Sequence, residues 1–109
     1  MQQYGTGGYF VFLRVISDST QCNTGGALLQ QNIFYHVTAT FDGSHINMYV
    51  NGALTNSCGA TGLLAAGKEP LQIGSAANGY YFPGAMDDIR IYNRALSSAE
   101  VQQIYQGSL

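Results

Sequence analysis

The chain has very few charges of either sign. Only four of its 109 residues are Lys or Arg and six are Asp or Glu, so 9% are charged, against about 25% in an ordinary soluble domain. Four scattered basic residues cannot form the phosphate-binding stripe of a nucleic-acid-binding protein. They also provide no cluster for an anionic membrane surface. The sequence therefore argues against nucleic acid and membrane as partners.

Long apolar runs are also missing. None approaches the roughly 20 residues of a membrane-spanning helix, so we expect no membrane insertion. The start "MQQYGTGG" lacks the basic residues and apolar stretch of a signal peptide, so the chain as given is not expected to direct its own export. Its 109 residues suffice for one hydrophobic core, and we predict a single domain over residues 1–109.

Cysteine is scarce, with only Cys22 and Cys58 present. No CxxC pair occurs, which argues against a zinc site. Two free thiols and a disulfide both remain open, and the polar, glycine-flanked surroundings of each cysteine favour the disulfide. Closing a loop of about 36 residues would stabilise the fold by about 3–4 kcal/mol and would imply an oxidising compartment.

The apolar residues that are present alternate with period two, between turn signals about every ten residues. This pattern predicts an all-β fold. We expect a central strand over residues 8–17, a loop over 18–26 and a short strand over 27–30. An antiparallel meander follows, with Asp42-Gly43 and Asn51-Gly52 as its two tight turns and one buried face.

The C-terminal half predicts shorter elements. Loops are expected over residues 56–70 and 76–84, and strands over 71–75 and 85–92. A helix then begins after Ser97, with Glu100 completing a capping box. Its apolar side is expected to be formed by Val101, Ile104 and Tyr105, and Gly107 to end it.

Several motifs resemble a known family. In order they are "FYHVTATFDGSHINMYVNG", "LQIGS" and "YYFPGAMDDIRIYNRALSSAEV". Together they are similar to the laminin-G-like jelly roll of the concanavalin A-like lectin/glucanase superfamily, over about residues 33–105, and the end of the chain resembles the pentraxins. The resemblance implies an antiparallel β-sandwich with a short C-terminal helix. The resemblance indicates the fold more strongly than the function, because one fold can have many functions.

Two departures from the family stand out. Phe34 occupies the position where the family commonly has tryptophan. Family domains also usually begin several strands earlier, so this chain is predicted to be a fragment or a shortened version of the domain. Open strand edges invite pairing with another chain, and we therefore expect self-association or contact with a neighbouring domain.

Asp87 and Asp88 are the first candidate site. Adjacent strand residues face opposite sides, so in the predicted strand Asp87 shares the core side with Ile89 and Ile91, while Asp88 lies beside Arg90. The structural interpretation, with a surface ion pair worth at most about 1 kcal/mol, is favoured. The alternative is calcium, implied by the resemblance, with Asp87, Asp88 and Asn78 as ligands.

The aromatic stretch 78–84 is the second candidate. Tyr80 and Tyr81 could stack on a sugar ring with Asn78 binding hydroxyls, whereas Phe82 is expected in the core. His36 and His45 lie on polar strand faces, not directly opposite each other, and form no metal site.

Catalysis is not expected. The glucanase pattern Glu-x-Asp-x-x-Glu is absent, and Glu69 and Glu100 are the only glutamates. The leading prediction is a non-catalytic binding module, for carbohydrate, in a secreted or cell-surface protein. The alternative is a structural or adhesion module that contacts another protein or a neighbouring domain.

Overall fold

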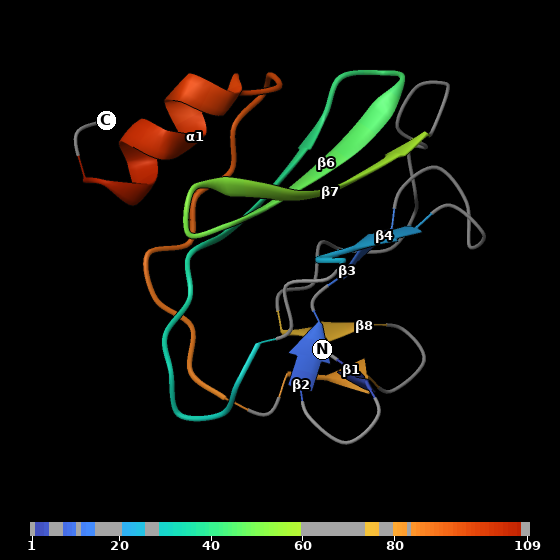
Figure 1. Cartoon of the computed structure of the whole chain (residues 1–109), viewed down its shortest axis with the longest axis vertical. Coiled ribbons are helices and arrows are strands. Elements are labelled where there is room, and N and C mark those ends of the chain that lie inside the picture. The colour runs from blue at the N-terminus through green and yellow to red at the C-terminus, as the bar shows by residue number, and fades with distance from the viewer. Residues whose placement is uncertain are drawn as a thin grey trace.

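The computed structural model describes residues 2–4, 8–10, 12–14, 21–25, 29–59, 74–76, 80–82 and 84–107. Within these ranges the strands are antiparallel and one helix lies near the C-terminus (Figure 1). The elements are β1 (Gln2–Tyr4), β2 (Gly8–Phe10), β3 (Phe12–Arg14), β4 (Gln21–Asn23), β5 (Val37–Phe41), β6 (His45–Val50), β7 (Ala53–Gly59), β8 (Ser75–Ala76), β9 (Tyr80–Tyr81) and α1 (Ser98–Tyr105). The all-β prediction with a short C-terminal helix is confirmed.

The predicted meander forms the central sheet, in the order β5-β6-β7. In β5 and β6, Val37 pairs with Val50 and Phe41 with Ile46. The turn Asn51-Gly52 has positive φ at both residues, 51° and 81°, as a two-residue hairpin of this type requires.

The Asp42-Gly43 turn differs from the prediction, because only Gly43 has positive φ, at 95°. Asp42 stabilises the turn through its side chain instead. Its Oδ1 accepts hydrogen bonds from the backbone N–H groups of Ser44 and His45, at 2.9 and 2.8 Å. These bonds, that of Ser44 first, lower the pKa of Asp42, because they favour the ionised carboxylate.

Strand β6 is buried on both faces, which corrects the prediction of one buried face. On one side Ile46 and Met48 pack against Cys22, with Val37, Phe41 and Cys58 at the margin. On the other side Tyr49 packs against Leu96 and Val101. The return of the chain as α1 covers the second face, so the sheet lies between a helix and the β3–β4 pair (Figure 1).

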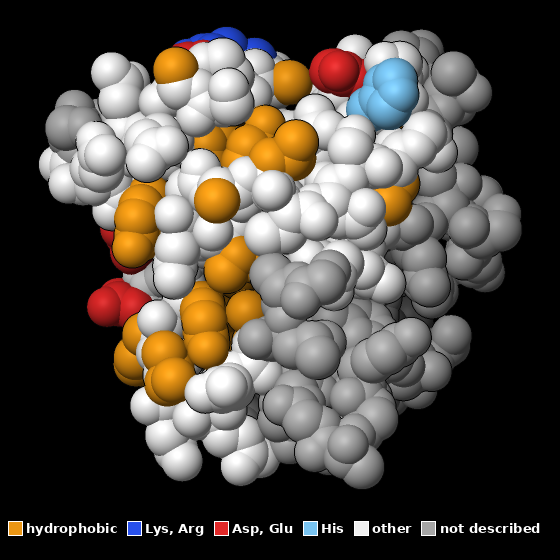
Figure 2. Space-filling view, viewed as in Figure 1, with side chains coloured by type: hydrophobic (Ala, Val, Ile, Leu, Met, Phe, Trp, Pro, Cys, Tyr) orange, Lys and Arg blue, Asp and Glu red, His pale blue; other side chains and the backbone are white. Residues whose placement is uncertain are grey.

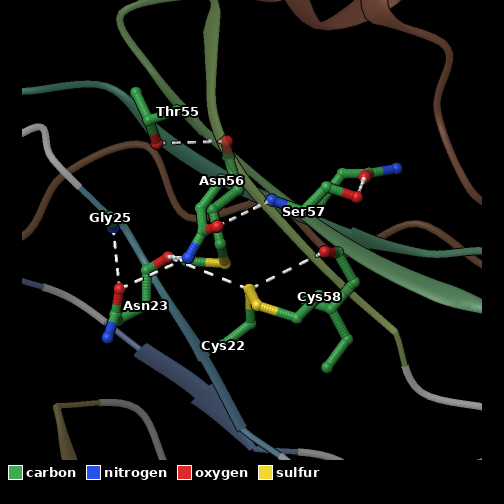
Figure 3. Close-up of a disulfide and its surroundings, with 10 residues drawn as sticks. Cys22, Asn23, Gly25, Thr55, Asn56, Ser57 and Cys58 are labelled. Atoms are coloured by element: carbon green, nitrogen blue, oxygen red, sulfur yellow. Dashed lines mark hydrogen bonds between the residues drawn. A yellow bond between two sulfur atoms is a disulfide. The ribbon is translucent and has the colours of Figure 1, made fainter.

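A disulfide joins the two sides of the first core. Cys22 of β4 is bonded to Cys58 of β7, with Cα atoms 5.8 Å apart and a sequence separation of 36 (Figure 3). Asn56 adds a second tie by donating from Nδ2 to the Asn23 carbonyl oxygen, at 3.1 Å. At Gly25, a Cβ would lie 2.7 Å from the Thr55 carbonyl oxygen, so only glycine permits this close approach. The predicted disulfide is confirmed.

Helix α1 begins as predicted. The Ser97 hydroxyl accepts from the Glu100 backbone N–H at 3.2 Å, and the Glu100 carboxylate accepts from the Ser97 N–H at 3.1 Å. Val101 is buried and Ile104 half-buried, whereas Tyr105 is exposed. Gly107 follows the helix with φ of 77°. The helix is short, and no helix among the described residues is long and apolar enough to cross a membrane.

Several predicted boundaries are wrong. The expected central strand over 8–17 appears as β2 and β3, which pair with different partners, β1 and β4. Strand β4 lies inside the predicted loop 18–26, and β7 extends into the predicted loop 56–70. Both segments are polar and have weak strand patterns of their own. In the structure β4 pairs with β3 and β7 with β6, and the disulfide joins β4 to β7.

Other predicted elements are only partly described. The expected strand over 27–30 has a single bridge at Leu29, and residues 26–28 lie outside the described residues. Residues 71–73 and 60–70 also lie outside them, so the strand and loop predicted there stay predictions. The predicted loop 76–84 contains β9, which pairs with β8.

The predicted strand over 85–92 does not form. Residues 84–95 have no strand assignment and are exposed. Asp88 has φ of 53°, a left-handed conformation that interrupts the alternation of an extended chain. Ile89 and Ile91 were expected in the core and are instead 55% and 71% exposed.

Candidate functional site

A groove lies between β5 and the irregular segment that leads to α1. Its volume is about 610 Å³, within the range typical of ligand sites. We call it the edge groove. Its walls are residues 36–41, residues 88 and 90–96, and Ile104 of α1.

The first wall is the edge of β5 rather than one face of it. Six consecutive residues, 36–41, line the groove, whereas one face of a strand would contribute only alternate residues. The edge of a sheet carries backbone N–H and C=O groups. Among the described strands, β5 pairs only with β6, so this edge is open within the part of the chain that the structure describes.

The hydrogen bonds of the sheet identify which backbone groups face the groove. The Asn51 N–H donates to the His36 carbonyl oxygen at 2.7 Å, and the Asp42 N–H to the His45 carbonyl oxygen at 3.3 Å. Even-numbered residues of β5 therefore bond toward β6, because bonding direction alternates along an antiparallel strand. The backbone groups of Val37, Ala39 and Phe41 point the other way, into the groove.

The second wall carries two ion pairs. Arg90 Nε donates to Asp88 Oδ1 at 2.9 Å, which confirms the predicted surface pair and raises the pKa of Arg90. Arg94 donates to both Glu100 carboxylate oxygens, at 2.8 Å to Oε1. The Arg94 bonds first, and the Ser97 N–H second, lower the pKa of Glu100 to about 2. Both arginines therefore face a compensating carboxylate.

Hydrophobic side chains are exposed on the side of the molecule where residues 30–36 and 85–92 run (Figures 1 and 2). Ile91 lines the edge groove. Exposed single apolar residues are ordinary, but several close together mark contact surfaces. We call this set the apolar strip, and its members are Ile33, Phe34, Met86, Ile89, Ile91 and Tyr92.

The aspartate prediction is partly corrected. Asp87 is exposed instead of facing the core, because residues 85–92 do not form a strand. Its Oδ1 accepts from the Asp88 N–H at 2.8 Å. Asn78 lies outside the described residues, and among the described ones no three His, Cys, Asp or Glu side chains group as metal ligands do. Calcium at these three residues stays a prediction.

The carbohydrate prediction is untested. Tyr80 and Tyr81 form β9, but their side chains and Asn78 lie outside what the structure describes. Phe82 is half-buried, and a Cβ on Gly84 would lie 3.0 Å from its ring.

The histidines are separate from one another. His36 is half-buried, with its ring 5.8 Å from that of Tyr105, and His45 is exposed and pairs with Gly59. Glu100 closes the capping box and pairs with Arg94, whereas Glu69 lies outside the described residues.

Sequence reasoning missed the edge groove. It depends on the absence of pairing between β5 and residues 88–92, which alternation in the sequence cannot show. The one signal in the sequence that pointed to the edge groove was the expectation of open strand edges, made because family domains usually begin several strands earlier.

The chain belongs to the concanavalin A-like lectin/glucanases superfamily, whose laminin-G-type family model matches residues 2–102. This confirms the resemblance and the partial β-sandwich. Among solved structures, the chain is similar to a crystal structure of an S-layer domain-containing protein (residues 221–444) from Clostridium thermocellum ATCC 27405, with a TM-score of 0.56 and 25% identity. The match covers 78% of this chain and 44% of that one. A comparison with curated proteins gave no match.

Proposed function

We propose that this domain is a non-catalytic binding module of an extracellular or cell-surface protein, and that it contacts another polypeptide through the apolar strip. Laminin-G-like domains are generally non-catalytic. The disulfide fits an oxidising location, and the S-layer domain-containing protein fits a surface setting.

The exposure of two isoleucines is the observation that favours a polypeptide as the ligand. Ile89 and Ile91 are 55% and 71% exposed in a segment that has no strand partner among the described residues. Full burial of an exposed isoleucine contributes about 1.5–3 kcal/mol, so a partner that covers the exposed part of these two side chains gains about 1–2 kcal/mol from each. No comparable apolar surface is needed to bind sugar hydroxyls.

A random peptide library displayed on phage tests this proposal against the immobilised domain. We expect enrichment of apolar sequences. The double variant Ile89→Ser/Ile91→Ser should weaken their binding by about tenfold or more, because two apolar contacts are lost. Leu54→Ser is the matched control, since Leu54 is 56% exposed and lies outside the edge groove. No enrichment above an empty surface contradicts the proposal.

Carbohydrate is the second candidate ligand. It is supported by the lectin members of the superfamily and by the consecutive tyrosines of β9. A glycan array tests it. A hit abolished by Tyr80→Ala or Tyr81→Ala, with Tyr35→Ala as the aromatic control, supports the lectin interpretation.

Two finer predictions accompany these proposals. Calcium at Asp87, Asp88 and Asn78 predicts that the melting temperature rises with calcium and falls with EDTA; an unchanged value argues against a site. Self-association predicts a mass above that of one chain in light scattering. A stable monomer over a concentration series counts against it.

A further inference from the structure

We propose that the open edge of β5 accepts one extended polypeptide strand, which lies in the edge groove between β5 and residues 88–92 and extends the central sheet. This inference rests on the proposed function and specifies how the polypeptide is held. Backbone hydrogen bonds to β5 would supply the recognition, and the apolar strip would add burial at its end.

Backbone groups of β5 are available to an added strand. The N–H and C=O groups of Val37, Ala39 and Phe41 face the groove, as the hydrogen bonds of His36 and Asp42 with β6 require. No hydrogen bond joins these outward groups to another residue of the described ranges.

The size of the groove fits a single strand. A strand in a sheet rises about 3.4 Å per residue, lies about 4.8 Å from its neighbour and belongs to a layer about 10 Å thick, so each residue occupies about 160 Å³. The groove volume of about 610 Å³ therefore corresponds to about four residues of a single strand. Residues 88 and 90–96 form the wall opposite β5, which favours a single strand over the edge of a folded sheet.

The charged side chains of the groove walls are paired. Arg90 is paired with Asp88, and Arg94 with Glu100. The walls therefore carry compensated charges, which favours an uncharged segment over an acidic ligand. A neutral strand that alternates apolar and hydroxyl side chains matches β5, which has Val37 on one face and Thr38 and Thr40 on the other.

The probe is an end-blocked peptide of about seven alternating Val and Thr residues, with one Lys at each end for solubility. Its length spans the five residues of β5. The matched probe is the same peptide with N-methyl groups on all of its Val and Thr backbone nitrogens. This removes the donors on both edges of the strand, which alternate along the chain, without removing side chains.

Amide hydrogen exchange of the full chain reports the result residue by residue. In the free protein we expect fast exchange at Val37, Ala39 and Phe41 and slow exchange at Thr38 and Thr40. The first peptide should slow exchange at the three outward amides by about tenfold or more and leave the two threonines unchanged. The N-methylated peptide should have no effect.

A pair of variants provides the second measurement. Ala39→Pro removes an outward N–H, which an edge strand tolerates, and should abolish peptide binding, whereas Ala39→Val keeps the N–H and should retain it. If Ala39→Pro fails to fold, the comparison of the two peptides on the unmodified protein still decides.

Three outcomes overturn the inference. The first is equal binding of the N-methylated peptide. The second is protection confined to other residues. The third is protection of the outward amides that rises with protein concentration alone, since a second copy then covers the edge. Failure here, while library peptides still bind, refutes strand addition only; absence of any peptide binding refutes the proposed function as well.

Discussion

The β5–β6–β7 meander and the segment 84–95 have similar sequence patterns and different structures. Both alternate apolar and polar residues, in "HINMYV" and in "AMDDIRIY". In the meander, Ile46 and Met48 are buried against Cys22, whereas Ile89 and Ile91 are exposed. Alternation therefore indicates a strand only where a neighbouring strand supplies hydrogen bonds and a second layer covers one face.

The largest contrast between the two regions should appear on truncating one isoleucine in each. Ile46→Ala should lower the free energy of unfolding by about 4 kcal/mol, because Ile46 is 0% exposed and truncation leaves a cavity. Ile91→Ala should change it by less than about 0.5 kcal/mol. Urea denaturation measures both. Similar losses at the two sites would show that Ile91 is packed in solution.

Removal of the disulfide should have the next largest effect. The double variant Cys22→Ser/Cys58→Ser should lose about 3–4 kcal/mol, because the unfolded chain regains the freedom of the closed loop. Reduction of the unmodified protein by dithiothreitol should shift its thermal unfolding to a similar extent. An unchanged melting temperature after verified reduction contradicts the tie between β4 and β7.

The helix cap tests the C-terminal end of the irregular segment, where α1 begins. Ser97→Ala should cost about 1 kcal/mol, since the Glu100 N–H loses its acceptor. Ser97→Asp, which retains an acceptor, should recover most of the loss. Thermal unfolding of the three proteins provides the measurement, and equal stabilities would mean that the cap contributes nothing.

The smallest effect should be the pH dependence from Glu100. Its pKa in the folded protein is about 2, below the ordinary value of 4.5. The stabilisation is therefore complete above about pH 4.5 and is lost as the pH falls toward 2. Glu100→Gln keeps a capping acceptor and removes the charge, so its stability should fall less over this window. Melting temperatures between pH 2 and 5 give the comparison, and identical slopes would contradict it.

The sequence predicts best the features that depend on local chemistry. The turn Asn51-Gly52 requires positive φ at both positions, and the capping box of Ser97 and Glu100 needs only a spacing of three residues. The disulfide was predicted from composition and context, although two free thiols were also open. The family resemblance then supplied the order of the elements.

The sequence fails where a residue depends on distant partners. Strand β4 has a polar sequence, and its place in the fold depends on its pairing with β3 and on the bond from Cys22 to Cys58 of β7. Asp87 was expected to face the core, but that placement required residues 85–92 to form a strand. Among the described residues this segment has no strand partner. The edge groove also could not be predicted from the sequence, because an open edge is a property of the whole sheet and not of any single segment.

The disulfide also determines how the domain would carry a mechanical load. Residues 23–57 lie inside the closed loop and include β5, β6 and most of β7. A force that pulls on the two ends of the chain passes through the sulfur–sulfur bond and bypasses this sheet. About 120 Å of extended chain, at about 3.4 Å per residue, would stay out of reach of stretching until the bond is reduced. In a surface protein under tension, the central sheet and the proposed binding edge would thus stay folded while the flanking segments extend.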